Sequence, residues 1–207
     1  MKNLMIKTLV LSICQTNCYR NTKEGFIVDP ADRAGVIIEQ CRNIGMKPCA
    51  VLLTHGHFDH MSAAKEVRDH FKIPVYAGEK ERELLGDAGM NLSAAWAKAV
   101  AMEADIWVKE NDIMELADCS IRVIETPGHT PGGVSYYIEE EAALVSGDTL
   151  FCESLGRRDF PGSSTAAILH SIREKLFSLP EDTDVYAGHM EPTTIGHEKT
   201  YNPAAAF

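Results

Sequence analysis

The sequence lacks an excess of positive charge and any long apolar run, and each absence narrows the possible functions. Lysine plus arginine number 20 against 30 aspartates and glutamates, giving a net charge of −10. An acidic surface repels phosphate backbones, which argues against a nucleic-acid partner. No apolar stretch reaches the ~18–20 residues that span a bilayer, so we expect no membrane segment. The opening "MKNLMIKTLVLSIC" is interrupted by Lys7 and lacks a small-residue cleavage site, so we expect strands there rather than a signal peptide.

Paired cysteines and flexible linkers are also missing. The six cysteines are scattered and form no Cys-x-x-Cys pair. Without a secretion signal, this spacing indicates reduced thiols, and we expect a cytoplasmic location. No repeat, low-complexity tract or linker interrupts the 207 residues. We therefore expect a single domain over residues 1–207, and the sequence leaves its oligomeric state open.

Strand-like and helix-like runs alternate early in the chain, and strand-like runs follow one another later. The runs rich in Val, Ile and Tyr span residues 5–13, 25–30, 49–55, 73–78, 120–129, 134–140, 142–148 and 183–189. Helical patterns span residues 33–44, 62–72 with Ser62 as the expected cap, 80–102 with breaks at Gly86 and Gly89, and 164–179 before Pro180. The order predicts an α/β or mixed α+β protein.

The stretch "VLLTHGHFDH", residues 51–60, places three histidines and an aspartate directly behind a short apolar run. Three later runs end in the same manner, in "TPGH", "SGD" and "AGH". Ligands of open α/β sheets bind beyond the carboxyl ends of strands, where loops converge. If these strands are neighbours, their ends bring together seven side chains: His55, His57, Asp59, His60, His129, Asp148 and His189.

Imidazole and carboxylate groups suit zinc, iron or manganese, and no thiolate is needed. Seven ligands are too many for one tetrahedral ion, so the set suits two ions that share a bridging carboxylate. Asp148 is the expected bridge because it stands alone on its loop. His55 and His57, two positions apart, can hold one ion, and Asp59 and His60 then face the other.

Ordinary structural roles are the competing interpretation of these residues. A His-x-His pair can simply occupy a polar loop, and an aspartate in "SGDT" often bonds to its own backbone. The metal interpretation is favoured because five of the eight histidines fall in strand-end turns. His70 and His170 lie within helical runs and are expected to be surface or packing residues. For His197 we also favour a structural role.

The motifs resemble those of the metallo-β-lactamase fold. "THGHFDH" resembles its His-x-His-x-Asp-His signature, and "TPGHTPGG", "SGDTLF" and "YAGHMEPTTIGHE" resemble its later metal motifs in the same order. "TNCYR", "FIVDP" and "GRRDFPGSS" are similar to the short bacterial members of the glyoxalase II-like branch. The resemblance implies a four-layer αββα sandwich. It also implies that Asp148 bridges a first metal held by His55, His57 and His129 and a second held by Asp59, His60 and His189.

The sequence departs from the family pattern at two points. Met190 follows His189 where the family usually has glycine, which puts full occupancy of the second metal site in question. The chain ends soon after the last metal motif, so we expect no helical extension of the kind that completes the glutathione pocket of long glyoxalase II enzymes. In "LGRRDF", Arg157 stands where those enzymes carry a glutathione-binding lysine, and Asp159 where they carry a tyrosine. Arg157 either meets a substrate carboxylate or forms an ion pair with Asp159.

The resemblance implies a metal-dependent hydrolase of a thioester similar to S-lactoylglutathione, a small-molecule substrate. Two divalent ions, zinc in first place with iron or manganese as alternatives, would activate the attacking water. Asp59 and Asp148 are the expected catalytic residues, since Asp59 would also orient the nucleophile. The main alternative is a persulfide dioxygenase, in which a single Fe(II) would be held by His55, His129 and Asp148.

The sequence gives less support to three other functions: a flavodiiron protein, a nuclease and a binding module without catalysis. His57 stands where flavodiiron proteins carry glutamate, and a nuclease would want a basic arm. A binding module without catalysis would be expected to have lost a ligand, yet all seven are present.

Overall fold

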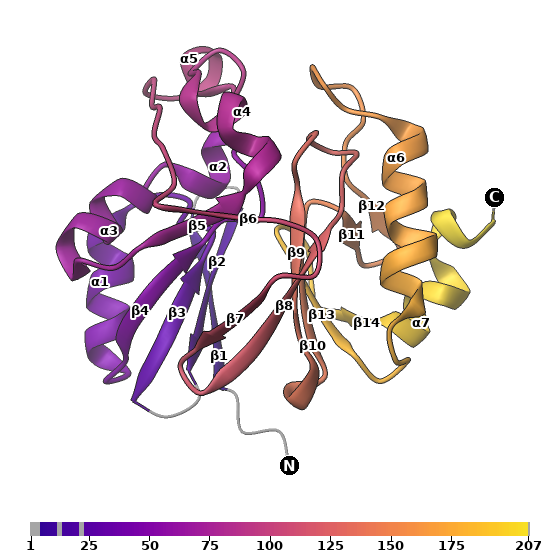
Figure 1. The fold of residues 1–207 in the computed structure, drawn as a ribbon, viewed down its shortest axis with the longest axis horizontal. Helices are drawn as coiled ribbons and strands as arrows, with labels where there is room; N and C mark the ends of the chain where they lie inside the picture. Colours follow the sequence, from indigo (N-terminus) through magenta and orange to yellow (C-terminus); the bar gives the residue numbers. More distant parts are fainter. Residues whose placement is uncertain (1–4, 12–13, 21–22, 207) are drawn as a thin grey trace.

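The computed structural model describes residues 5–11, 14–20 and 23–206. Among these residues the strands form two six-stranded sheets and a separate hairpin (Figure 1). The first sheet has the order β1 (Met5–Leu11), β2 (Cys14–Arg20), β3 (Glu24–Val28), β4 (Lys47–Leu52), β5 (Val75–Gly78), β6 (Ile106–Val108). The second has the order β14 (Thr193–Thr194), β13 (Asp184–Ala187), β10 (Ala143–Gly147), β9 (Val134–Ile138), β8 (Cys119–Glu125), β7 (Ile113–Leu116). The hairpin pairs β11 (Leu150–Phe151) with β12 (Ser154–Leu155).

The helices are short and flank the sheets. They are α1 (Ala34–Asn43), α2 (Phe58–Met61), α3 (Ala64–Phe71), α4 (Arg82–Gly86), α5 (Ser93–Trp96), α6 (Thr165–His170) and α7 (Ile195–Tyr201). A π-helical segment, η3 (Ser171–Lys175), extends α6, and single 3-10 turns occur at η1 (Glu79–Glu81), η2 (Glu139–Glu141), η4 (Leu176–Ser178) and η5 (Pro203–Ala206). In the described part of the chain, no helix has both the length and the apolarity to cross a membrane.

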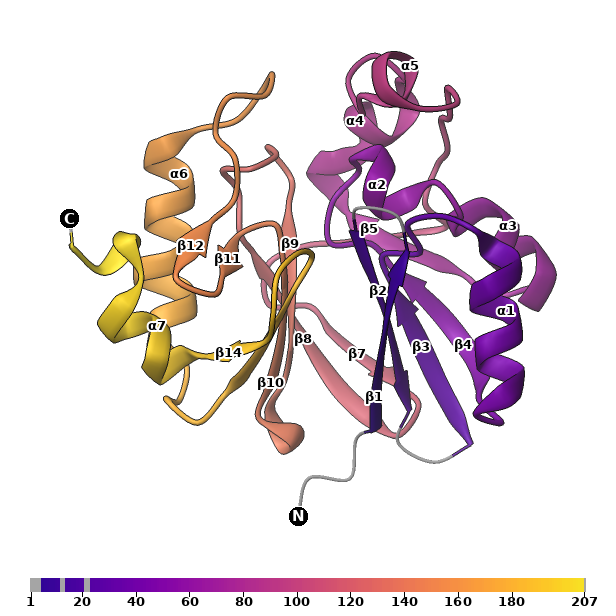
Figure 2. The same cartoon turned by 180° about the vertical axis from the view of Figure 1, so that it is seen from behind.

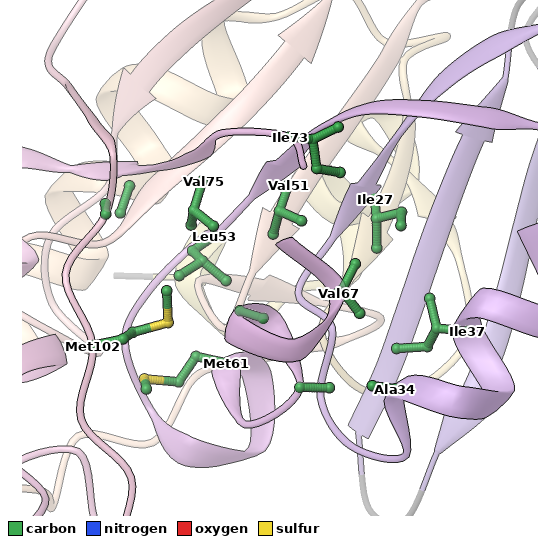
Figure 3. Close-up of a cluster of buried hydrophobic side chains, with 14 of the residues drawn as sticks. Ile27, Ala34, Ile37, Val51, Leu53, Met61, Val67, Ile73, Val75 and Met102 are labelled. Atoms are coloured by element: carbon green, nitrogen blue, oxygen red, sulfur yellow. The ribbon is translucent and has the colours of Figure 1, made fainter. Parts of the chain in front are cut away.

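Alternation of side chains along β3 and β4 creates the layers. Ile27 and Val51 point toward α1 and α3 and pack there with Ile37 and Val67 (Figure 3). Their sequence neighbours Phe26, Val28, Ala50 and Leu52 point the other way, into a cluster shared with the second sheet. A third cluster joins the second sheet to the α6–η3 and α7 helices. These helices lie along the outer face of that sheet (Figure 2). Both faces of β3 and β4 and of the central strands of the second sheet are therefore buried, which confirms the αββα sandwich.

The helices that cover the sheets begin and end largely where the sequence predicts. Ala34, Ile37 and Cys41 lie on one buried face of α1, and the chain leaves the helix through Gly45 at φ 65°. The hydroxyl of Ser164 accepts a hydrogen bond from the amide of Ala167 and caps α6 where the predicted helix begins.

One helix prediction is wrong, and another is confirmed only in part. Ser62 does not cap the third helix; its hydroxyl donates to the carbonyl of Phe58 and closes α2 instead. The run at 80–102 breaks after Gly86, as predicted, but its helical parts are only the two short helices α4 and α5. Asp87 accepts hydrogen bonds from the amides of Gly89 and Met90, which turns the chain between them.

Among the described cysteines, Cys49 and Cys152 have free thiols, as expected. The strand predicted at 5–13 is confirmed as far as Leu11, and residues 12–13 lie outside the described residues.

Two hydrogen bonds tie the sheets together where β4 ends. The hydroxyl of Tyr136 in β9, which is fully buried, donates to the carbonyl of Leu53 at 2.7 Å. Two residues earlier on β9, the amide of Val134 donates to the carbonyl of Thr54 at 2.8 Å. These bonds fix the distance between the sheets directly beside the "THGHFDH" loop.

Replacing Tyr136 by phenylalanine should therefore destabilise the fold. The change leaves the buried carbonyl of Leu53 without its donor, which costs about 1–3 kcal/mol. Urea denaturation followed by circular dichroism measures the loss. Tyr201→Phe, at an exposed hydroxyl, is the control and should leave the midpoint unchanged. Equal midpoints for both variants would contradict the role of the inter-sheet bond.

Candidate metal centre

The four loops predicted to carry metal ligands meet at one end of the sandwich, although their strands do not lie in one sheet. The loop after β4 comes from the first sheet, and the loops after β8, β10 and β13 come from the second. Of the latter, β10 and β13 are parallel neighbours, and β9 separates β8 from β10. The predicted residues therefore converge across the seam between the sheets rather than along one sheet edge.

All seven predicted side chains lie close together. Three groups have potential ligand atoms within 4.8 Å of one another and could each hold a metal ion: His55, His57 and His129; His55, His60 and Asp148; Asp59, His60 and His189. The overlap of the groups makes one continuous cluster with room for two ions.

Asp148 lies at the centre of this cluster. Its Oδ1 is 3.4 Å from His60 Nε2, and its Oδ2 is 3.4 Å from His189 Nε2 and 3.5 Å from His129 Nε2. These separations exceed a good hydrogen bond, but they match the ~3.4 Å between two ligands that each lie ~2.1 Å from a tetrahedral ion. One carboxylate thus faces both histidine groups.

The protonation of the cluster suits cation binding. Burial, together with the neighbouring imidazoles, lowers the pKa of His57 to about 3 and that of His55 well below its usual value, so both rings are neutral. Burial opposes ionisation of Asp148, but His60 and His189 outweigh it and hold the pKa of that carboxyl well below its usual range. His55 Nε2 is buried without a hydrogen-bond partner among the described residues. A buried, unpaired acceptor is costly unless a ligand satisfies it, so these residues fit a metal centre.

Hydrogen bonds behind the cluster set the orientation of three rings. The Nδ1–H of His60 donates to Asp29 Oδ2 at 3.0 Å, and that of His129 to the carbonyl of Arg157 at 2.9 Å. Thr54 Oγ1 donates to Asp29 at 2.6 Å, so it accepts from His55 Nδ1 at 3.1 Å. In each ring Nδ1 donates a hydrogen bond, so Nε2 is the nitrogen that faces the centre.

Two buried carboxylates that support the centre have roles the sequence did not reveal. Asp29, at the end of β3, accepts bonds from Thr54 and His60. Glu81, in η1, accepts from the amides of Gly56 and Gly132 at 2.8 and 2.7 Å, joining the "THGHFDH" and "TPGHTPGG" loops. Burial raises the pKa of Glu81, while its hydrogen bonds act in the opposite direction. Asp29 stands in the quoted "FIVDP", but nothing in the run around Glu81 distinguishes it from a surface residue.

The cluster opens into a pocket with an apolar rim. Apolar side chains from both halves of the molecule line it: Phe58, Leu92, Trp96, Phe151, Leu155, Phe160 and Met190. Arg157 is the cation among the lining residues, and its side chain is committed elsewhere. Its Nε and Nη2 lie 3.0 and 2.7 Å from the Asp159 carboxylate, and its guanidinium lies over the Phe160 ring. Of the two roles considered for Arg157, the ion pair with Asp159 is the one observed.

Met190 and the histidines outside the cluster were also interpreted from the sequence, and the structure shows their surroundings. Met190 is half-exposed and has φ 69°, a left-handed backbone that favours the glycine the family usually places there. His189 nevertheless reaches Asp148, so the substitution preserves the loop. His70 and His170 are exposed on helices, as predicted. His197 lies beside Cys152 and Glu198, a grouping the sequence analysis missed.

Comparison with known proteins supports a family assignment. The family model for the metallo-β-lactamase superfamily matches residues 11–189. The probable metallo-hydrolase YqgX of Bacillus subtilis is 38% identical over 179 residues, covering 86% of this chain and 85% of that protein. Hydroxyacylglutathione hydrolase GloC of Haemophilus influenzae is 31% identical over 204 residues, covering 96% of each.

Solved structures agree with the sequence relatives. The crystal structure of the BLEG-1 B3 metallo-β-lactamase has a TM-score of 0.92 and 40% identity, covering 96% of this chain and 98% of that one. TTHA1623, in a di-iron-bound form, has a TM-score of 0.84 and 32% identity with the same coverage. The chain therefore belongs to the metallo-β-lactamase superfamily of metal-dependent hydrolases, and a hydroxyacylglutathione hydrolase is among its relatives, as its motifs predicted.

Proposed function

We propose that this chain is a single-domain thioester hydrolase that uses two divalent metal ions. The position of Asp148 carries the proposal. Its Oδ2 lies 3.5 Å from His129 Nε2 in the first group and 3.4 Å from His189 Nε2 in the second, and its Oδ1 lies 3.4 Å from His60 Nε2 in the second. The carboxylate therefore adjoins both groups, as a bridging ligand would. His55, His57 and His129 would hold the first ion, and Asp59, His60 and His189 the second. All six of these partners are histidine or aspartate, which suits zinc, iron or manganese.

Bound there, the ions would supply hydroxide by lowering the pKa of water from ~15.7 towards ~7 and would polarise the thioester carbonyl. Asp59, partly exposed at the pocket mouth and 3.7 Å from His189 Nε2, would orient the attacking water. The leaving thiol has an ordinary pKa of ~8.5, so it departs as thiolate with little help from a general acid. That suits a pocket whose lining residues offer few proton donors besides the ligand set.

The relatives include both a thioester hydrolase and a β-lactamase, and the first supports the proposed activity. GloC is a hydroxyacylglutathione hydrolase, whereas BLEG-1 is described as a β-lactamase. For the metals, we propose zinc, and the di-iron form of TTHA1623 makes iron the first alternative.

A mononuclear iron dioxygenase is the second candidate. His55 Nε2 has no hydrogen-bond partner in the described part of the chain, and His129 Nε2 lies 3.5 Å from Asp148, so these three side chains could also form a facial triad. In that case Asp59, His60 and His189 would hold no ion.

Metal content and substrate preference distinguish the candidates. Protein purified anaerobically should contain about two ions per chain in the ligand set and should hydrolyse S-lactoylglutathione and smaller thioesters. The same panel should include nitrocefin as a β-lactam and glutathione persulfide with an oxygen electrode. One iron per chain, together with persulfide-dependent oxygen uptake, would show that the protein is a dioxygenase and not a hydrolase. Hydrolysis of nitrocefin without hydrolysis of any thioester would show that the substrate is a β-lactam and not a thioester.

Asp148→Ala should abolish activity and reduce the metal content, because no neighbouring side chain spans both groups. Metal analysis and thioester turnover of the same preparation measure the effect. His70→Ala, on the exposed face of α3, is the control and should behave as wild type. An Asp148→Ala variant that kept two metals and near-full turnover would rule out the dinuclear assignment.

Glu81→Gln should weaken metal binding without removing a ligand. A glutamine oxygen can accept from one glycine amide, but its NH2 group faces the other amide and leaves it unpaired. The two loops that carry His57 and His129 then separate more easily, so we expect a lower metal affinity and a lower melting temperature. Competition with a chromophoric chelator measures the affinity, and Glu83→Gln, on the exposed side of α4, is the matched control. Equal affinities for both variants would show that Glu81 does not position the loops.

Arg157→Ala should raise the KM for S-lactoylglutathione only a few-fold and leave kcat nearly intact. Asp159 already neutralises the guanidinium, and the backbone carbonyl that orients His129 survives the change. Steady-state kinetics with S-lactoylglutathione and a smaller thioester test this, with Arg158→Ala as the control. A KM rising by orders of magnitude for the glutathione substrate alone would instead reveal a dedicated glutathione site.

A further inference from the structure

A second group of potential metal ligands lies outside the cluster around Asp148. Cys152 and Glu153 form the turn between β11 and β12, and His197 and Glu198 lie in the first turns of α7. Potential ligand atoms of Cys152, His197 and Glu198 all lie within 4.8 Å of one another. They come from two segments that Figure 2 shows side by side on the outer face of the second sheet.

We propose that Cys152, Glu153, His197 and Glu198 form an accessory zinc site that fastens the β11–β12 hairpin to α7. The proposal is independent of the reaction at the first cluster. One thiolate, one imidazole and two carboxylate oxygens make a tetrahedral set that zinc accepts.

The distances suit such a site. His197 Nε2 lies 3.1 Å from Glu153 Oε1 and 4.0 Å from Glu198 Oε1. Nitrogen and oxygen ligands at ~2.1 Å from a tetrahedral ion lie ~3.4 Å apart, between these two values. Small rotations of the exposed Glu153 and the half-exposed His197 would equalise them.

Glu198 is held in place before any ion binds. Its side chain is fully buried, and Oε2 accepts from the amide of Glu153 at 2.9 Å and from Asn202 Nδ2 at 2.7 Å. Oε1 accepts from the hydroxyl of Thr193 at 2.6 Å, which leaves its second lone pair for a metal ion. These three donors are neutral, so a cation would compensate the charge of a buried carboxylate better than they do.

The electrostatic surroundings of Cys152 point the same way. The carboxylates of Glu191, Glu198 and Glu153 place negative charge around its thiol. Negative charge gathered around a thiol disfavours the free thiolate but attracts a divalent cation, which then displaces the proton.

Such a site would act on the fold rather than on the substrate. The Thr193 hydroxyl that bonds to Glu198 belongs to β14, directly after the loop that carries His189. Phe151, next to Cys152, lines the pocket and lies 6.0 Å from the His189 ring. An ion at the accessory site would therefore steady the β11–β12 hairpin behind that loop.

Cobalt titration of the metal-free full chain tests the proposal. The first ligand set contains no cysteine, so a sulfur-to-cobalt charge-transfer band in the near ultraviolet reports on the accessory site alone. Wild-type protein should develop this band at stoichiometric cobalt and lose it when zinc is added. It should also bind one more zinc per chain than Cys152→Ser does.

Variants separate the accessory site from other thiols. Cys152→Ser should lose the band and the additional zinc, and His197→Ala should need much more cobalt to develop the band. Cys49→Ser, which alters a half-buried thiol in β4, should keep the wild-type titration. No band in the wild type, or a band that persists in Cys152→Ser, would overturn the proposal. The first result would leave Glu153 and His197 as an ion pair only.

Discussion

The geometry of the metal centre depends on one buried carboxylate, Asp29. Thr54 donates to it through both its amide and its hydroxyl, and His60 donates through Nδ1. The Thr54 hydroxyl donates its proton to Asp29, so its oxygen must accept a hydrogen bond from His55 Nδ1. Asp29 therefore orients the His55 imidazole indirectly, through Thr54. One side chain at the end of β3 thus fixes the tautomers of two rings, one directly after β4 and one in α2.

The site lies at the seam of the sandwich because loops from both sheets contribute to it. The loop after β4 belongs to the first sheet, and the other ligands belong to the second. Val134, Tyr136 and Glu81 each bridge the two sides beside the ligands. Any change in the packing of the sheets would therefore alter the distances between ligands, which couples the stability of the fold to metal binding.

The sequence predicted the cluster of seven candidate ligands because each of these residues follows a buried strand, and strand ends in a layered fold converge. It also predicted the helices whose apolar positions recur at helical spacing, such as α1. It failed where a role depends on a distant partner. Glu81 lies 25 positions from Gly56 and 51 from Gly132, and only the fold brings these amides to its carboxylate. It also failed at Ser62, whose hydroxyl can close the preceding helix as readily as it can cap the following one.

The hydrogen bond from His129 Nδ1 to the carbonyl of Arg157 links the substrate range to the geometry of the metal site, two properties that enzymes commonly vary separately. The loop that contains Arg157 and Phe160 lines the pocket, so insertions or replacements there are the natural route to a new substrate range. In this protein such a change also moves the acceptor that holds a metal-facing imidazole in its tautomer. Evolution or design of new specificity through this loop must therefore conserve the path of its backbone at residue 157, while the side chains around that position are free to diverge.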